Sequence, residues 1–331
     1  MMRFAFFSIV TFLVVLVLSC NNSPTENLEQ SKNRFDEIIS LIEENGNYFL
    51  SDNLDFIVDA ETVKENFIGK DDYLLIDVRL KEDYDKNHIE GTINVEYEDL
   101  FDYFFNEINP KDYEKILLIC QSGMRTTFAT SIFMALGINN VYSLKFGTSS
   151  WHKDIATEWI SQPSDDYTEN LVNESNLEEL KVYDFPLIEA DSETSYEILK
   201  NRAKVLLSES YRNYSYRFNK IEDLAEFYII CYENSDLYEL GHIPNAHFYS
   251  SADLLRNSKL STLPNDKPIL LYDSDGQMTG FINGYLRLLG YETYSVSFGA
   301  NSFMYDVILK NIPDFAFVEN NTIRNYPIIS N

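Results

Sequence analysis

The chain has 331 residues, 45% of them hydrophobic, which is enough for one large domain or two of ordinary size. Its 53 acidic residues against 26 Lys and Arg give a formal charge of −27, so it lacks the basic excess that binding to a nucleic-acid backbone requires. The three cysteines are too few and too far apart for a disulfide framework, and they argue against a structural zinc site.

The first twenty residues follow the pattern of a secretion signal. One basic residue, Arg3, precedes an apolar run from Phe4 to Leu18, which is shorter than the roughly 20 residues that span a bilayer. The sequence Val-Leu-Ser-Cys that ends at Cys20 resembles a bacterial lipobox. This resemblance implies removal of residues 1–19 and lipidation of Cys20, which would anchor the protein to a membrane of the bacterial cell envelope, outside the cytoplasmic membrane. An uncleaved membrane anchor is the alternative.

Residues 20–53 are predicted to form a polar tether and one short amphipathic helix, Phe35–Glu44, where apolar residues recur at helical spacing. After residue 54 the pattern becomes that of an α/β domain. Three short apolar runs are typical of buried parallel strands, and they are Tyr73–Val78, Lys115–Ile119 and Val141–Leu144. A helix is expected over Thr126–Leu136, with Gly137 at its C-cap position. The first domain is therefore predicted over residues 54–160.

Residues 161–212 are predicted to be an acidic linker followed by a helix. Residues 161–194 contain ten Asp or Glu, one Lys, two Pro and no Gly, a composition typical of a solvated connecting segment. The helix is expected around Tyr196–Leu207.

The remaining residues, 213–331, repeat the pattern of the first domain. Tyr73–Gly91 aligns without a gap on Phe227–Asn245, and Lys115–Thr127 aligns on Pro268–Gly280. The chain has only 12 glycines, and several of them fall in register in these alignments. The sequence therefore predicts an internal duplication and a second α/β domain.

Cys120 is the candidate nucleophile, because it ends a predicted buried strand and precedes a predicted helix. A loop between a parallel strand and a helix N-terminus directs several backbone N–H groups into one bowl, which stabilises an anion at its centre. Gly123 permits the positive φ that closes such a loop, and Arg125 adds a permanent positive charge at its rim. A buried, inert thiol is the alternative for Cys120.

With this loop, the sequence resembles the rhodanese, or sulfurtransferase, family. The residues that carry the resemblance in the first half are Leu75-Ile76-Asp77-Val78-Arg79, Tyr84, His88-Ile89-Glu90-Gly91, Ile93-Asn94-Val95, Cys120 to Arg125, Leu136-Gly137, Val141-Tyr142 and Gly147 to Trp151. The resemblance covers about residues 54–155 and, more weakly, 213–325. It implies two rhodanese-like α/β domains, each a parallel sheet flanked by helices. Trp151 resembles the family's closing aromatic near the active face, although core packing would explain it equally well.

The resemblance also implies an activity and a set of site residues. Sulfane sulfur would pass from thiosulfate or a persulfide donor to a thiol or cyanide acceptor, by way of a persulfide on Cys120. No metal or organic cofactor is implied. The residues expected to bind the substrate are Gln121, Ser122, Gly123, Met124 and Arg125. Arg125 is the only cation of this loop, so the acidic chain is expected to repel a dianion such as thiosulfate and to accept a persulfide donor at least as well.

Two alternatives follow from the loops themselves. Phosphatase loops of the tyrosine-phosphatase type have five residues between Cys and Arg, whereas this loop has four, which favours sulfur over phosphate.

In the second domain Asp273 stands at the position of Cys120 and Met278 at that of Arg125, so that loop cannot carry a persulfide. A pair of carboxylates, Asp273 and Asp275, could in principle bind a metal ion. A non-catalytic module that binds a protein partner in the envelope is the alternative function.

Overall fold

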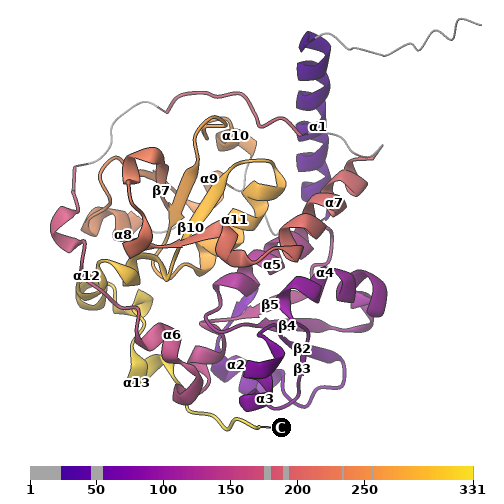
Figure 1. Cartoon of the computed structure of the whole chain (residues 1–331), viewed down its shortest axis with the longest axis vertical. Coiled ribbons are helices and arrows are strands. Elements are labelled where there is room, and N and C mark those ends of the chain that lie inside the picture. The colour runs from indigo at the N-terminus through magenta and orange to yellow at the C-terminus, as the bar shows by residue number, and fades with distance from the viewer. Residues whose placement is uncertain are drawn as a thin grey trace, which may run out of the picture.

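Two parallel sheets organise the chain, and each has helices on both faces (Figure 1). The computed structural model describes residues 24–45, 55–174, 180–188, 194–232, 235–254 and 257–330. The predicted signal segment and the predicted lipidation site, Cys20, lie outside these residues. No helix in these ranges combines the length and the apolar character needed to cross a membrane.

The first sheet has the strand order β1-β5-β4-β2-β3, and all its pairings are parallel. Its strands are β1 (Ile57–Val58), β2 (Tyr73–Asp77), β3 (Thr92–Asn94), β4 (Lys115–Ile119) and β5 (Val141–Leu144). The helices of this domain are α2 (Ala60–Asn66), α3 (Lys81–Lys86), α4 (Leu100–Asp102), α5 (Met124–Ala135) and α6 (Thr157–Ile160). Nearly every residue of β4 is buried, as the continuous apolar run predicts for a central parallel strand.

The second sheet repeats the first, with the equivalent order β6-β10-β9-β7-β8 and parallel pairing throughout. Its strands are β6 (Ser215–Arg217), β7 (Tyr228–Tyr232), β8 (His247–Tyr249), β9 (Ile269–Tyr272) and β10 (Thr293–Ser297). The helices that follow residue 180 are α7 (Ser195–Ser208), α8 (Ser235–Leu240), α9 (Ser251–Leu254), α10 (Asn257–Leu260), α11 (Gln277–Leu288), α12 (Tyr305–Asn311) and α13 (Glu319–Thr322). The predicted duplication of an α/β domain is thus confirmed.

Helices α5 and α11 pack against each other and join the two domains. Two glycines of α11 allow the backbones to approach closely. A Cβ atom on Gly280 would lie 2.7 Å from the carbonyl oxygen of Met124, and one on Gly284 would lie 2.8 Å from that of Phe128. Because α5 lies between its own sheet and α11, almost all of its side chains are buried.

The helix α1 (Pro24–Asn45) contains the predicted helix Phe35–Glu44 and belongs to the central core. Its buried residues, Phe35, Ile38, Ile39 and Ile42, recur at helical spacing. They join one hydrophobic cluster that draws residues from both domains, whereas each domain also has a smaller outer cluster of its own. The two domains therefore share a core, and the first half of α1 extends beyond it (Figure 1).

The segment that follows each domain crosses to the other domain. After the first domain, Tyr167 N–H donates to the carbonyl oxygen of Phe303, and Val172 forms an antiparallel bridge with His242. After the second domain, the C-terminal segment runs across the first domain, where Ile329 forms the equivalent bridge with His88. Figure 1 shows this yellow segment ending near α3. His88 and His242 occupy the same position in the two repeats, so the exchange of segments is reciprocal.

Candidate active site

Cys120 follows β4 directly and lies at the N-terminus of α5, as predicted. Its side chain is 1% exposed. The Sγ atom accepts a hydrogen bond from Gly123 N–H at 3.1 Å, and the hydroxyl of Thr126 lies 3.4 Å away. The first N–H groups of α5 have no acceptor within the helix. The sulfur thus lies in a cradle of hydrogen-bond donors.

A second loop, which follows β5, binds the backbone of the Cys120 loop through hydrogen bonds. Thr148 N–H donates to the carbonyl oxygen of Cys120 at 2.8 Å, and Ser149 N–H donates to that of Gln121 at 3.3 Å. Gly147 lies so close to the backbone of the Cys120 loop that a Cβ atom would collide with it. We call residues 146–149 the supporting loop.

The structure brings most of the predicted substrate-binding residues to one cavity of about 550 Å³. Its walls include Cys120, Gln121, Ser122, Met124 and Arg125. The amide of Gln121 donates to the carbonyl oxygen of Ile155 at 2.6 Å, and the guanidinium of Arg125 lies over the ring of Tyr97, 5.2 Å from its centroid. Gly123 serves the site through its N–H group, since it is buried behind the cavity wall.

The opposite wall of this cavity comes from the second half of the chain, which the sequence analysis did not foresee. It contributes three further cations, Arg212, Arg217 and Lys220. Arg125 is the only cation of the Cys120 loop, as predicted, but the cavity as a whole is lined by four cations. The sequence contains a pattern that could have identified these residues. Residues 210–220 carry three basic side chains and no acidic one, in a strongly acidic chain.

The two tryptophan residues of the first domain have different surroundings. Trp151, expected either near the active face or in the core, is buried in the outer core of the first domain, and its indole N–H donates to the carbonyl oxygen of Pro327 at 2.9 Å. Trp159 lies beside the active loop, because its indole N–H donates to the carbonyl oxygen of Ser122 at 3.0 Å. Its ring also contacts Phe146 and Phe298, one from each domain.

In the second domain, the carboxylate of Asp273 fills the equivalent cradle. It accepts hydrogen bonds from Gly276 N–H, from Thr279 N–H at 3.0 Å and from the Thr279 hydroxyl at 3.3 Å. Burial and the neighbouring Asp275 raise the pKa of Asp273 to about 7. Both carboxylates of this loop accept N–H hydrogen bonds. Among the described residues, no three His, Cys, Asp or Glu side chains gather as a metal site would require.

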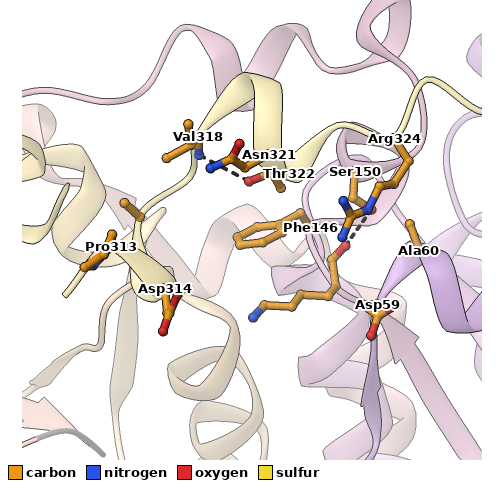
Figure 2. A pocket seen from close by; sticks show the side chains of 12 residues that line it. Asp59, Ala60, Phe146, Ser150, Pro313, Asp314, Val318, Asn321, Thr322 and Arg324 are labelled. Carbon is orange, nitrogen blue, oxygen red and sulfur yellow. Dashed lines mark hydrogen bonds between the residues drawn. The ribbon is translucent and has the colours of Figure 1, made fainter.

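A separate cavity of about 300 Å³ lies on the other side of the contact between the domains (Figure 2). Figure 2 shows Phe146 between Asp314 on one side and Ser150 and Arg324 on the other. Lys145 and Phe146 stand here where Ser297 and Phe298 stand at the Cys120 cavity. The described residues that line it include no cysteine and none of the 273–278 loop. It is thus the counterpart of the Cys120 cavity, without a cysteine among the described residues of its wall.

Comparison with known proteins gives one family for both halves. A model of the rhodanese-like domain matches residues 59–154 and 220–304. The adenylyltransferase and sulfurtransferase UBA4 of Meyerozyma guilliermondii is 27% identical over 97 residues, which are 27% of this chain and 22% of that protein. The thiosulfate sulfurtransferase GlpE of Shewanella oneidensis is 28% identical over 80 residues, which are 24% of this chain and 75% of that protein.

A solved thiosulfate sulfurtransferase from Pseudomonas aeruginosa is 17% identical, covers 82% of this chain and 47% of that one, and has a TM-score of 0.30. The chain spans about a fifth of the length of the first curated relatives it matches. The two segments matched by the family model together make up more than half of the chain, and each contains four of the five strands of one sheet. This protein therefore belongs to the rhodanese-like domain family and carries two such domains in tandem.

Proposed function

We propose that this protein is a sulfurtransferase that carries sulfane sulfur as a persulfide on Cys120. The observation that carries the proposal is the position of the Cys120 thiol, which accepts a hydrogen bond from Gly123 N–H beside the Thr126 hydroxyl, on the wall of a cavity lined by four cations. A thiol that served only packing would need neither the donors nor the cations.

The reaction proceeds by two displacements at sulfur. The Cys120 thiolate attacks the outer sulfur of the donor, and the S–S bond of the donor breaks. The leaving group is sulfite when the donor is thiosulfate, and a thiolate when the donor is a persulfide. In each case the leaving group takes the electron pair of the broken S–S bond. In the second step an acceptor thiolate or cyanide attacks the outer sulfur of the Cys120 persulfide, and the cysteine thiolate is released.

The hydrogen bonds of the 273–278 loop in the second domain favour an anionic intermediate on Cys120 in the first domain. In the second domain, three donors of the cradle bind the carboxylate of Asp273, and the equivalent donors in the first loop belong to Gly123 and Thr126. Burial, and after it Asp275, raises the pKa of Asp273, and Asp275 has Ser122 as its counterpart in the first domain. The cradle of Cys120 thus keeps the donors without the like charge of a neighbouring carboxylate, which favours an anion there.

The donor that fits this cavity is an anion. Four cations, Arg125, Arg212, Arg217 and Lys220, line the cavity with one carboxylate, that of Glu158, so positive charge prevails around the sulfur despite the acidity of the chain. The volume of about 550 Å³ lies within the range of about 300–1,000 Å³ that is usual for pockets holding small molecules. Thiosulfate and a persulfide of a small carboxylated thiol are therefore both proposed donors.

The location of this activity rests on the sequence alone. We propose that the protein acts in the bacterial cell envelope, held to a membrane by lipid on Cys20, where an envelope protein is a further candidate partner. Metabolic labelling with a fatty acid should mark the native chain and fail to mark Cys20→Ser. Absence of label from the native chain would refute the lipid anchor.

Intact-mass measurement tests the proposed function. The purified protein is incubated with thiosulfate or with glutathione persulfide, beside Cys120→Ser. We expect a gain of about 32 Da, one sulfur atom, that is lost on addition of cyanide and absent from Cys120→Ser. If neither donor loads Cys120 in the folded protein, the sulfurtransferase function is refuted and a binding role takes its place.

A further inference from the structure

We propose that Gln277, in the inactive loop of the second domain, is a positioning residue for the active loop of the first domain. The proposal rests on the proposed function, because it assigns to the second domain a part in sulfur transfer at Cys120. Gln277 makes a contact between the two domains. Gln277 follows the loop glycine Gly276 and is 1% exposed.

The side chain of Gln277 reaches two parts of the active site at once. Its Oε1 atom accepts a hydrogen bond from Phe146 N–H, in the supporting loop, at 2.8 Å. The same amide packs against Gly123, where a Cβ atom would lie 3.1 Å from Cδ of Gln277 and closer still to Oε1. Phe146 has a left-handed backbone conformation, with φ of 59°, and its N–H points toward the other domain.

Asp275 fixes the orientation of this amide. The Nε2 atom of Gln277 donates to Oδ2 of Asp275 at 2.9 Å, and the backbone N–H of Gln277 donates to Oδ1 at 3.0 Å. If the amide rotated by half a turn, Nε2 would face the N–H of Phe146, and two buried donors would meet. The carboxylate thus ensures that the oxygen of Gln277 faces the first domain.

Both contacts involve a segment that is hydrogen-bonded to Cys120. Gly123, on which Gln277 packs, donates the hydrogen bond to Sγ of Cys120. Phe146, which Gln277 binds, begins the supporting loop, whose Thr148 holds the carbonyl oxygen of Cys120 at 2.8 Å. One side chain from the second domain therefore holds the cradle on two sides of Cys120.

The first domain makes the reciprocal contact with a weaker acceptor. Met124 is the counterpart of Gln277, and its Sδ atom lies 3.0 Å from the N–H of Phe298 and packs against Gly276. A thioether sulfur is a weak hydrogen-bond acceptor compared with an amide oxygen. The stronger acceptor of the pair thus supports the loop that carries the cysteine, and the weaker one supports the loop that carries Asp273.

Steady-state kinetics of two Gln277 variants test the proposal, with the donor that loads Cys120. In Gln277→Ala the acceptor for Phe146 and the contact with Gly123 are lost. We expect kcat to fall about tenfold with KM for the donor unchanged, because the cations of the cavity remain in place. Gln277→Met introduces the residue type of Met124, the counterpart of Gln277 in the first domain. For this variant we expect kcat within about threefold of that of the native protein.

A matched variant separates positioning from general loss of stability. Asn140 is a half-buried amide that donates to the carbonyl oxygens of Pro110 and Tyr113, away from both loops. Asn140→Ala should lower the melting temperature and leave kcat unchanged. The proposal is overturned if Gln277→Ala keeps the native kcat, or if Gln277→Met is as slow as Gln277→Ala.

The rate of alkylation of Cys120 by iodoacetamide gives a second readout that needs no sulfur donor. We expect Gln277→Ala to slow this reaction about tenfold and Gln277→Met to restore it. If no donor loads the native protein, the proposed function fails, and the alkylation rates still decide whether Gln277 positions the sulfur. Equal rates in the native protein and in Gln277→Ala would then refute the positioning role as well.

Discussion

Asp273 and Cys120 occupy the same position in two copies of one loop, and each accepts a hydrogen bond from the N–H of the glycine three residues later. The fold thus offers the same group of donors twice. In one copy they bind the carboxyl group of Asp273, and in the other they surround the thiol of Cys120, which we propose receives sulfur. The difference between the two domains lies in the side chain placed in the cradle, not in the cradle itself.

The two thiols of the described chain should differ sharply in reactivity. Burial raises the pKa of Cys231 to about 12, and its side chain lies in a core strand of the second domain. We therefore expect Cys231→Ala to keep at least half of the native rate of sulfur transfer, and Cys120→Ser to lose more than 99% of it. Cyanide-dependent thiocyanate formation measures both. Residual activity in Cys120→Ser would place the nucleophile elsewhere.

The cations of the second domain should govern donor affinity. Replacing Arg212 and Arg217 together by Gln removes two charges from the cavity and leaves the Cys120 loop intact. We expect KM for thiosulfate to rise about tenfold with little change in kcat, because an interaction that only binds the donor does not favour the transition state over the bound donor. The effect should shrink at high salt, which screens exposed charges.

Lys310 provides the control for that experiment, because it is an exposed cation of α12 that does not line the cavity. Lys310→Gln should leave KM unchanged. An equal rise in KM for Lys310→Gln and for the arginine variant would show that only the net charge of the protein matters.

The buried carboxylate of Asp273 should make stability depend on pH. Its pKa is about 7 in the folded protein, against an ordinary value of about 3.9 in an unfolded chain. The folded state therefore binds this proton more tightly, so the stabilisation is complete below about pH 4 and is lost as the pH rises through 7. The loss amounts to a few kcal/mol, on the order of 1.4 kcal/mol per pH unit between these values.

Urea unfolding from pH 4 to pH 8 tests this dependence in the native protein and in Asp273→Asn. The free energy of unfolding of the variant should fall less steeply with pH, since asparagine does not titrate in this range. Parallel curves for the two proteins would show that Asp273 is ionised throughout in the fold.

The crossed C-terminal segment should stabilise the first domain, although it follows the second in sequence. Arg324 N–H and Tyr326 N–H each donate to a backbone carbonyl of the first domain at 2.9 Å, and Ile329 pairs with His88. Ending the chain after residue 322 removes these bonds. At about 1 kcal/mol for each of these four backbone hydrogen bonds, we expect a loss on the order of 4 kcal/mol in the free energy of unfolding. Unchanged urea unfolding would mean that the segment only rests on the domain.

The sequence by itself determined the two α/β repeats and the loop that begins at Cys120. These features are local, because a buried parallel strand, a glycine that permits positive φ and a helix N-terminus follow one another within about fifteen residues. The alignment of the two halves even located Asp273 in the place of Cys120. Short segments with fixed spacing encode their own conformation, so the pattern of residues suffices to predict them.

Only the tertiary structure decided what surrounds that loop. The cations from residues 212–220 and the amide of Gln277 reach the site through the packing of one domain on the other, and the indole of Trp159 reaches it through the fold of the first domain. Their distance from Cys120 in the sequence ranges from 39 to 157 residues, and no spacing rule extends so far. Contacts of this kind depend on the complementary shapes of two folded surfaces, which exist only after the α5 and α11 helices have packed together.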